Sequence, residues 1–375
     1  MKERNRGLNN QLAITLVLLL AAFLRLWNLG SSAFTFDSAY LSNLAARFLS
    51  TGVPPAQGMV SSVGIVNPPL AVYLISLPVL LSRDPRVVTG FVAVANVIAV
   101  WECYLLGRRY WGHWQGTLAA LLLAVSPWAV YYSRGVGAQE LLLPGVILFF
   151  ALIMRWLVDH KSWAVAGATF TLAALVQIHF ATLALAPVLA AVLLASAVAS
   201  VRDRRGLWPW KPLVVGTVAG ALLYLPYLLV EAQNGWPSLH AWSNAPHAAS
   251  SIHWQTIELA LINIGARDIY SLAVPQQYQR FLSSLFPLAY WPDRLEETLV
   301  ILSSLYLFVR CWRERADRGA LARDGQDASP GSLRLRVGQQ QLQRTLYAHL
   351  QAGRRPLAGQ AGLCPGTRTA PPGPL

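Results

Sequence analysis

Long apolar stretches recur along the first 310 residues and are separated by short polar segments. Eight of these stretches are long enough, or nearly so, to cross the roughly 30 Å hydrocarbon core of a bilayer as helices. They cover residues 11–29, 87–106, 116–132, 140–157, 163–180, 183–200, 213–231 and 297–310. The pattern therefore predicts an all-α, polytopic membrane protein with about eight transmembrane helices.

The run from Pro69 to Leu81 is shorter and contains Pro78, so we place it by counting charges. If it does not cross, the basic residues between Arg108 and Lys211 fall on the cytoplasmic side, where Lys and Arg collect in membrane proteins. If the run crosses the membrane, the same basic residues fall on the outer side, which reverses the expected Lys/Arg bias at successive loops. We therefore expect an interfacial or re-entrant segment, and a chain with both termini in the cytoplasm.

This topology divides the chain into a transmembrane domain, residues 1–310, and a tail, residues 311–375. Two large outer loops, 30–86 and 232–296, are expected, with juxtamembrane helices on the outer face. The tail has no membrane-length apolar run and is rich in Arg, Gln, Pro and Gly. Such a composition predicts a largely disordered cytoplasmic extension.

Composition supports the membrane assignment and excludes other classes of protein. Hydrophobic residues make up 55% of the chain and charged residues only 13%, which leaves more apolar surface than one soluble core would bury. The formal net charge is +13, but cytoplasmic loops of membrane proteins collect basic residues, so we do not expect nucleic-acid binding. The three cysteines are widely separated, so neither a disulfide framework nor a zinc site is expected.

Asp37 stands out in the segment FTFDSAY, which follows the first apolar run. A carboxylate at the membrane surface is costly to retain unless it binds or reacts with something. Apolar residues from Tyr40 to Leu49 recur at helical spacing after Ser38, which predicts a short amphipathic helix on the membrane surface. Asp37 would lie at the N-terminal end of this helix, where backbone N–H groups favour the ionised form. A simple N-cap role is the alternative.

Other polar residues lie at predicted outer helix ends. Arg134 could either bind a phosphate or pair with Glu140 across the turn between two spans. His179, with Gln177 two residues before it, ends an apolar helix, where a structural hydrogen-bonding role is the commoner one. Arg25, near the outer end of the first span, is expected to snorkel toward the interface.

The order of several motifs resembles the membrane glycosyltransferases of the GT-C fold. The likeness is to the group of protein O-mannosyltransferases and lipid A aminoarabinose transferases, that is, to glycosyltransferase family 39. The segments that carry it are LRLWNL, FDSAY, NPPLAVYL, SPWAVYYSRGVGAQELL, VQIHFATLALAPVL and YLPYLLVEAQNGWPSL. The resemblance runs from Leu12 to about Glu296.

This resemblance implies a plasma-membrane enzyme that moves a sugar from a polyprenyl-phosphate carrier to a hydroxyl of a protein or lipid on the outer face. The family's first-loop aspartate corresponds to Asp37, which would act as the base that accepts the hydroxyl proton, with inversion at the anomeric carbon. The residues expected to bind substrate are Arg134, Glu140, His179, Asn67, Tyr40 and Gln177.

Two positions depart from the family pattern. Ser38 stands where a second acidic residue is common, and Asn67-Pro68-Pro69 stands where His-Pro-Pro is frequent. Without the paired carboxylates a divalent metal is not supported, so we expect no cofactor and no metal ligand. Because the likeness stops near Arg310, a truncated or frame-shifted, inactive chain is one alternative. A transporter or flippase of a polar-headed lipid is another.

Overall fold

The computed structural model describes residues 2–61, 64–202, 208–244, 254, 294–295, 297–306 and 309. The chain divides into two compact units, Met1–Asp293 and Arg294–Leu375, and each is described by itself. The predicted tail, 311–375, and most of the predicted outer loop 232–296 lie outside the described residues.

The described part of the chain is built from helices, and it contains no strand beyond an isolated antiparallel bridge between Val60 and Val66. This confirms the all-α prediction. In chain order the α-helices are α1 Lys2–Leu26, α2 Phe36–Thr51, α3 Leu70–Leu81, α4 Pro85–Tyr110, α5 His113–Val125, α6 Pro127–Tyr132, α7 Leu142–Leu157, α8 Trp163–Ile178, α9 Ala186–Arg202, α10 Trp210–Gln233 and α11 Pro237–Asn244. Three short 3-10 turns join them: η1 Leu29–Ser31, η2 Gln139–Leu141 and η3 Phe180–Leu185.

Five of the described helical segments are long and apolar enough to cross a membrane. They are Leu8–Leu26, Pro85–Tyr110, Gln139–Leu157, Phe180–Val198 and Trp210–Gln233. Three further predicted spans coincide with shorter apolar helices, His113–Val125, Trp163–Ile178 and Glu297–Tyr306. The prediction of a polytopic membrane protein is therefore confirmed.

Large apolar side chains on the outside of the helices indicate which surfaces face lipid. On α1, Leu12 and Leu19 are 59% and 61% exposed, and on α10 Leu222 is 63% exposed. Exposing these apolar side chains to water would cost free energy, whereas exposing them to the hydrocarbon of a bilayer would not. These faces are therefore suited to the bilayer.

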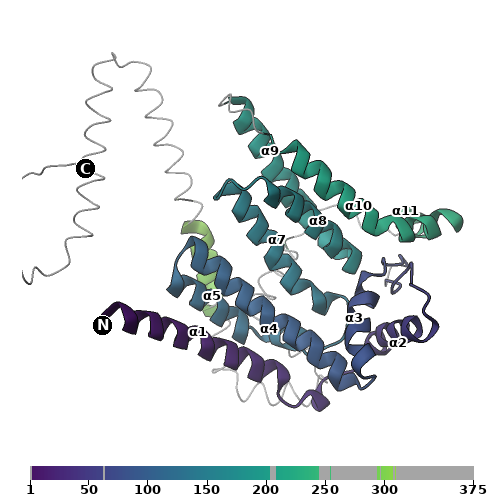
Figure 1. The fold of residues 1–375 in the computed structure, drawn as a ribbon, viewed down its shortest axis with the longest axis horizontal. Coiled ribbons are helices and arrows are strands. Elements are labelled where there is room, and N and C mark those ends of the chain that lie inside the picture. The colour runs from purple at the N-terminus through teal and green to yellow at the C-terminus, as the bar shows by residue number, and fades with distance from the viewer. Residues whose placement is uncertain are drawn as a thin grey trace, which may run out of the picture. The chain divides into compact units, whose positions relative to one another are not determined.

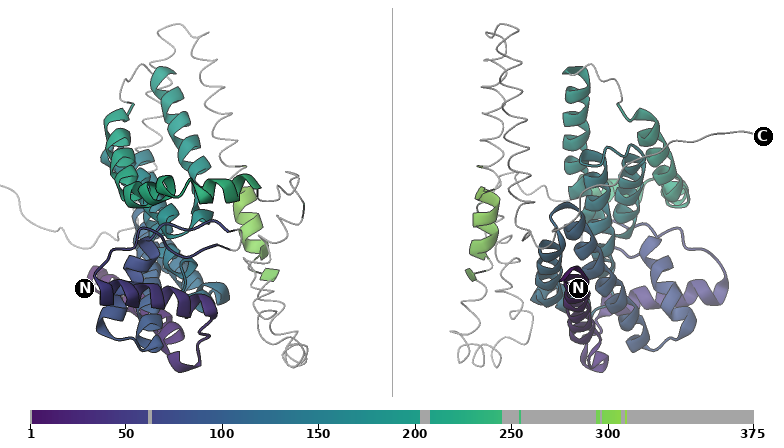
Figure 2. Two further views of the ribbon diagram at one scale, coloured as in Figure 1. Left: turned by 90° about the vertical axis from the view of Figure 1, so that its right-hand side faces the viewer. Right: turned by 60° about the vertical axis from the view of Figure 1, so that its left-hand side comes forward.

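Neighbouring helices pack in a row. α1 packs against α4 and α5, α4 also contacts α7, α7 contacts α8, and α8 contacts α10. The purple-to-blue helices and the teal helices accordingly form two adjoining groups in Figures 1 and 2. The long helix α4 joins the two groups, because it contacts helices of both.

Small residues allow the closest of these approaches. Gly216 and Gly220 lie one turn apart on α10 and face α8, where a methyl group on Gly220 would lie 2.6 Å from the Cβ of Ala173. Gly107 of α4 and Gly116 of α5 meet in the same way, since a methyl group on Gly107 would lie 2.6 Å from the Gly116 Cα. Apolar helices in lipid gain their packing energy from such contacts.

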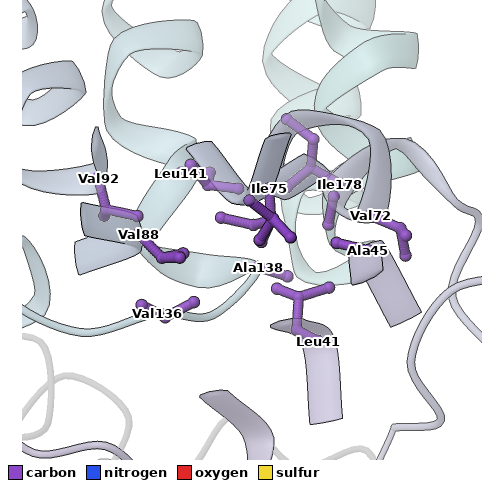
Figure 3. Close-up of a cluster of buried hydrophobic side chains, with 12 residues drawn as sticks. Leu41, Ala45, Val72, Ile75, Val88, Val92, Val136, Ala138, Leu141 and Ile178 are labelled. Carbon is purple, nitrogen blue, oxygen red and sulfur yellow. The ribbon is translucent and has the colours of Figure 1, made fainter. Parts of the chain in front are cut away.

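The predicted amphipathic helix is present as α2, and its buried residues Leu41 and Ala45 pack against α3. α3 has 12 residues and is therefore roughly 18 Å long, too short to cross the hydrocarbon core. Figure 3 shows that the two helices share a core with α4, the segment around Ala138, and the end of α8 at Ile178. This core holds α2 in place.

Candidate functional site

Asp37 lies in the first turn of α2, and its side chain is exposed. The helix begins after Thr35, whose backbone is extended and whose hydroxyl accepts a hydrogen bond from the Ser38 N–H at 3.3 Å. Thr35 is thus the N-cap, and the alternative that Asp37 serves as the cap is wrong. The Asp37 carboxylate is therefore not used to cap the helix.

Asp37 lines a cavity of about 700 Å³ that has polar and aromatic walls. Trp128 and Tyr132 stack there with ring centroids 5.5 Å apart, and the Tyr131 ring meets Tyr132 edge-on at 5.5 Å. The residues that line the cavity are Thr35, Asp37, Asn96, Trp128, Ala129, Tyr131, Tyr132, Val136, Gly137, Gln139, Glu140, Leu142, Leu143 and Val146. A cavity with carboxylates and aromatic ring faces is suited to a hydroxyl-rich ring.

A smaller cavity of about 290 Å³ adjoins the first, because both are lined by Thr35, Tyr131, Tyr132, Val136 and Glu140. The smaller one is also lined by Arg134. The structure thus brings three predicted site residues, Asp37, Glu140 and Arg134, to one region. They come from two segments about 100 residues apart in the chain.

The two glycines of the SRGVGAQE segment leave room for the Glu140 carboxylate. A methyl group on Gly137 would overlap the Glu140 Oε2, and one on Gly135 would lie 3.3 Å from Oε1. Oε2 is buried and has no hydrogen-bond partner among the described residues. The backbone is fixed from α4, where the Asn96 amide donates to the Glu140 carbonyl at 2.9 Å and to the Val92 carbonyl at 2.9 Å.

The Arg134 guanidinium binds the C-terminal end of α1. Its Nη1 donates to the carbonyls of Leu24 at 3.1 Å and Trp27 at 2.6 Å, and its Nη2 donates to the Asn28 carbonyl at 3.0 Å. These carbonyls lie where the helix ends and lacks its own donors. No ion pair joins Arg134 to Glu140, although both residues are described.

The sequence predicted that Arg25 snorkels toward the interface. This prediction is wrong, because Arg25 is fully buried. Its Nη1 donates to the Ala124 carbonyl at 2.8 Å and its Nη2 to the Leu123 carbonyl at 3.0 Å. These carbonyls lie at the end of α5, where Pro127 has no N–H to donate to Leu123. A guanidinium supplies the missing donors at lower cost than leaving the carbonyls unpaired in an apolar region.

The other four predicted substrate-binding residues do not line these two cavities. Tyr40 stacks on Phe36 one turn earlier on α2, with centroids 6.2 Å apart. Asn67 is buried, and its amide donates to the Met59 carbonyl at 3.0 Å. Both side chains therefore make local contacts in the first loop.

Gln177 and His179 lie at the end of α8. The buried Gln177 amide donates to the Leu223 carbonyl of α10. His179 follows the last residue of α8, and its Nδ1 accepts a hydrogen bond from the Ala181 N–H at 3.2 Å.

Sequence reasoning missed Asn96, Trp128 and Tyr132 as lining residues. One signal was available: Asn96 is an isolated amide within an otherwise apolar membrane-length run, and polar residues there usually have a specific partner. Within the described residues, no group of three or more His, Cys, Asp or Glu side chains could hold a metal ion.

Residues 66–229 match the sequence model of a protein family, dolichyl-phosphate-mannose-protein mannosyltransferase. The match supports a membrane glycosyltransferase of the GT-C type. It covers less than half of the chain, from the first loop to α10, and so includes Asn96, Arg134 and Glu140. Asp37 lies before the matched segment. No curated protein matches the chain.

Proposed function

We propose that this protein transfers a sugar from a polyprenyl-phosphate carrier to a hydroxyl group of a protein or lipid, with Asp37 as the base. The observation that carries the proposal is a cavity lined by aromatic rings and by the exposed carboxylate of Asp37, which does not cap its helix. The family match of the adjoining segment supports the polyprenyl-phosphate donor.

The proposed reaction is a single displacement at the anomeric carbon. Asp37 accepts the proton of the acceptor hydroxyl as the new C–O bond forms. The bond between the anomeric carbon and the phosphate oxygen breaks, and its electron pair leaves on the phosphate. Attack from the face opposite the leaving group inverts the configuration.

The two cavities suggest how the substrates divide. Carboxylates and aromatic rings line the larger cavity, so we place the sugar and the acceptor hydroxyl there. A phosphate would be repelled by Asp37, which lines only the larger of these two cavities, whereas Arg134 lines only the smaller one. We therefore place the donor phosphate in the smaller cavity, near Arg134. Arg134 also donates hydrogen bonds to the end of α1.

The family resemblance and the distribution of Lys and Arg residues suggest where the protein lies. We place the protein in the plasma membrane, with Asp37 on the outer face and both termini in the cytoplasm. The acceptor reaches Asp37 from that face, and the lipid chain of the donor remains in the bilayer.

Asp37→Asn tests the proposal, because an amide keeps the size of the side chain but cannot accept the proton. We expect transfer of labelled sugar from a polyprenyl-phosphate donor to fall at least about 100-fold. Asn43→Ala, at an exposed position of the same helix, is the matched control and should retain activity. Full activity of Asp37→Asn would reject the catalytic role. Movement of the donor headgroup across vesicles without a glycosylated product would favour a transporter instead.

A further inference from the structure

Glu231, near the end of α10, is a buried carboxylate that the proposed reaction does not use. It is only 2% exposed. Its Oε2 accepts from the Ser238 N–H at 3.0 Å, and its Oε1 accepts from the Ser238 hydroxyl at 2.9 Å and from the Gln57 amide at 3.2 Å. Burial of a carboxylate is costly unless donors surround it. These three donors lower the cost of burying Glu231, but they do not by themselves give this residue a function.

The turn that follows Glu231 is strained. Gly235 and Trp236 both have left-handed backbones, with φ of 74° and 62°. For a bulky side chain such as that of Trp236 this conformation is an outlier, and it persists only where neighbouring contacts hold it. The Glu231 carbonyl accepts from the Trp236 N–H at 2.7 Å, and its carboxylate accepts from Ser238 in the first turn of α11. Glu231 thereby holds the turn and the start of α11.

The same network reaches the first loop, at a hairpin whose described arms are residues 57–61 and 64–67. The Gly58 N–H donates to the Asn67 carbonyl at 2.7 Å and closes this hairpin. One arm is held by the bond from Gln57 to Glu231. The other arm is held at Val66, whose N–H donates to the Ser238 hydroxyl at 3.3 Å and whose carbonyl accepts from the Tyr227 hydroxyl at 2.9 Å.

The hairpin is in turn attached to the helix that carries Asp37. It lies in the connection between α2 and α3, and the Tyr73 hydroxyl of α3 donates to the Pro55 carbonyl at 2.7 Å. Tyr73 also packs edge-on against Phe48 of α2, with centroids 5.4 Å apart. α2 and α3 then share the core that contains Leu41 and Ile75 (Figure 3).

We propose that Glu231 is a positioning residue for the transfer reaction. It fixes α11 and the hairpin of the first loop to the end of α10 and so keeps α2 in the position that places Asp37 in the cavity. Apart from the bonds of this network, among them the one from Tyr227 of α10 to Val66, the first loop is joined to the bundle mainly through the apolar contacts of α2 and α3. This inference rests on the proposed function for its catalytic consequence, whereas the attachment itself is measured separately.

The attachment is tested by a distance measurement between two spin labels, attached to the thiols that Asn43→Cys and Leu239→Cys introduce. Both positions are exposed, the first on α2 and the second on α11, and Cys103, Cys311 and Cys364 are replaced by serine. We expect a narrow distribution in the parent and a broad one in Glu231→Ala, which leaves three donors without an acceptor. Glu231→Gln keeps one acceptor oxygen and should restore part of the order. Gln233→Ala, at an exposed position of the same helix end, is the control.

Activity is measured on the same variants without labels. A residue that acts through the position of Asp37 should change kcat and leave the donor KM within about twofold, and we expect kcat of Glu231→Ala to fall roughly 10- to 100-fold. Glu231→Gln should lie between this variant and the parent. Gln233→Ala should match the parent.

Two results would overturn the inference: a distance distribution in Glu231→Ala that equals the parent's, or a broadened distribution with unchanged kcat. Absence of sugar transfer by the parent chain is a different failure, because it rejects the proposed function. The distance distributions of Glu231→Ala and Gln233→Ala then decide alone whether Glu231 fixes α2 to α11.

Discussion

Arg25 and Arg134 each supply N–H groups to a helix end that lacks its own donors. Arg25 binds carbonyls at the end of α5, and Arg134 binds carbonyls at the end of α1. Since Arg134 also donates weakly to the Arg25 carbonyl at 3.4 Å, the two side chains connect α5, α1 and the segment that contains Tyr131 and Tyr132. A planar guanidinium with five donors suits this task better than a lysine would. The aromatic wall of the cavity is thereby tied to α1.

At the residue scale, the prediction concerns the space that Gly137 leaves for Glu140. Gly137→Ala places a methyl group on the Glu140 Oε2, so the carboxylate must leave its position. We expect the free energy of unfolding to fall by about 1–3 kcal/mol and kcat/KM for sugar transfer to fall with it. Thermal unfolding in detergent and the transfer assay measure the two effects.

Gly135→Ala is the matched control for this substitution. Its methyl group would lie 3.3 Å from the Glu140 Oε1, a contact that a small shift of the side chain relieves. Both glycines belong to the same segment, and neither has the left-handed backbone that would penalise alanine by itself. Equal effects of the two substitutions would contradict the assigned contact.

At the scale of elements, the packing of α8 on α10 combines small residues with one polar bond. Gly216 meets the Ala166 backbone, and Gly220 meets Ala173. The Gln177 amide donates to the Leu223 carbonyl. Between helices in lipid the hydrophobic effect gives little preference, so close contact and interhelical hydrogen bonds determine which faces pair.

Gly216→Ala should separate the two helices, because its methyl group would overlap the Ala166 carbonyl oxygen and lie 2.8 Å from the Ala166 Cα. We expect a loss of about 1–3 kcal/mol in the free energy of unfolding, measured in detergent. Val215→Leu changes the neighbouring position, which is 62% exposed, and should have little effect. A Gly216→Ala protein as stable as the parent would show that α8 and α10 are not in close contact there.

At the scale of the molecule, residues of different loops gather at opposite ends of the bundle. The bonds from Gln57 and Val66 place the first loop beside the end of α10. The cavity places the start of α2 beside the start of α7. The last residues of α4 meet the other end of α7, where Arg109 forms a 2.7 Å ion pair with Asp159. Hydrogen bonds from Arg109 and Tyr110 outweigh desolvation and lower the pKa of Asp159.

This arrangement allows a test of the proposed topology. Reporter fusions that end the chain at His160, between α7 and α8, and at Gly235, after α10, should report the cytoplasm and the exterior respectively. An alkaline phosphatase reporter should therefore be active only at Gly235, with expression of both fusions checked by immunoblot. Activity at His160 alone would reverse the orientation and place Asp37 on the cytoplasmic side.

The sequence alone could identify the charged residues of the candidate site. Asp37, Arg134 and Glu140 are charged residues beside apolar runs, so the sequence singled them out. Their partners could not be predicted in the same way. Arg134 was expected to bind a phosphate or Glu140. In the structure it donates to backbone carbonyls, which every residue carries and no sequence distinguishes, and its binding of a phosphate stays a prediction.

The sequence by itself determined the fold class and the presence of α2 and the short α3, because the length and period of apolar runs express the thickness of a bilayer and the pitch of a helix. It did not determine that Thr35 rather than Asp37 caps α2, or that Asn96 and Glu231 have hydrogen-bond partners in distant segments. Tertiary structure decided these points. Capping, cavity lining and buried hydrogen bonds depend on which helix ends meet, and that is set by packing between segments far apart in the chain.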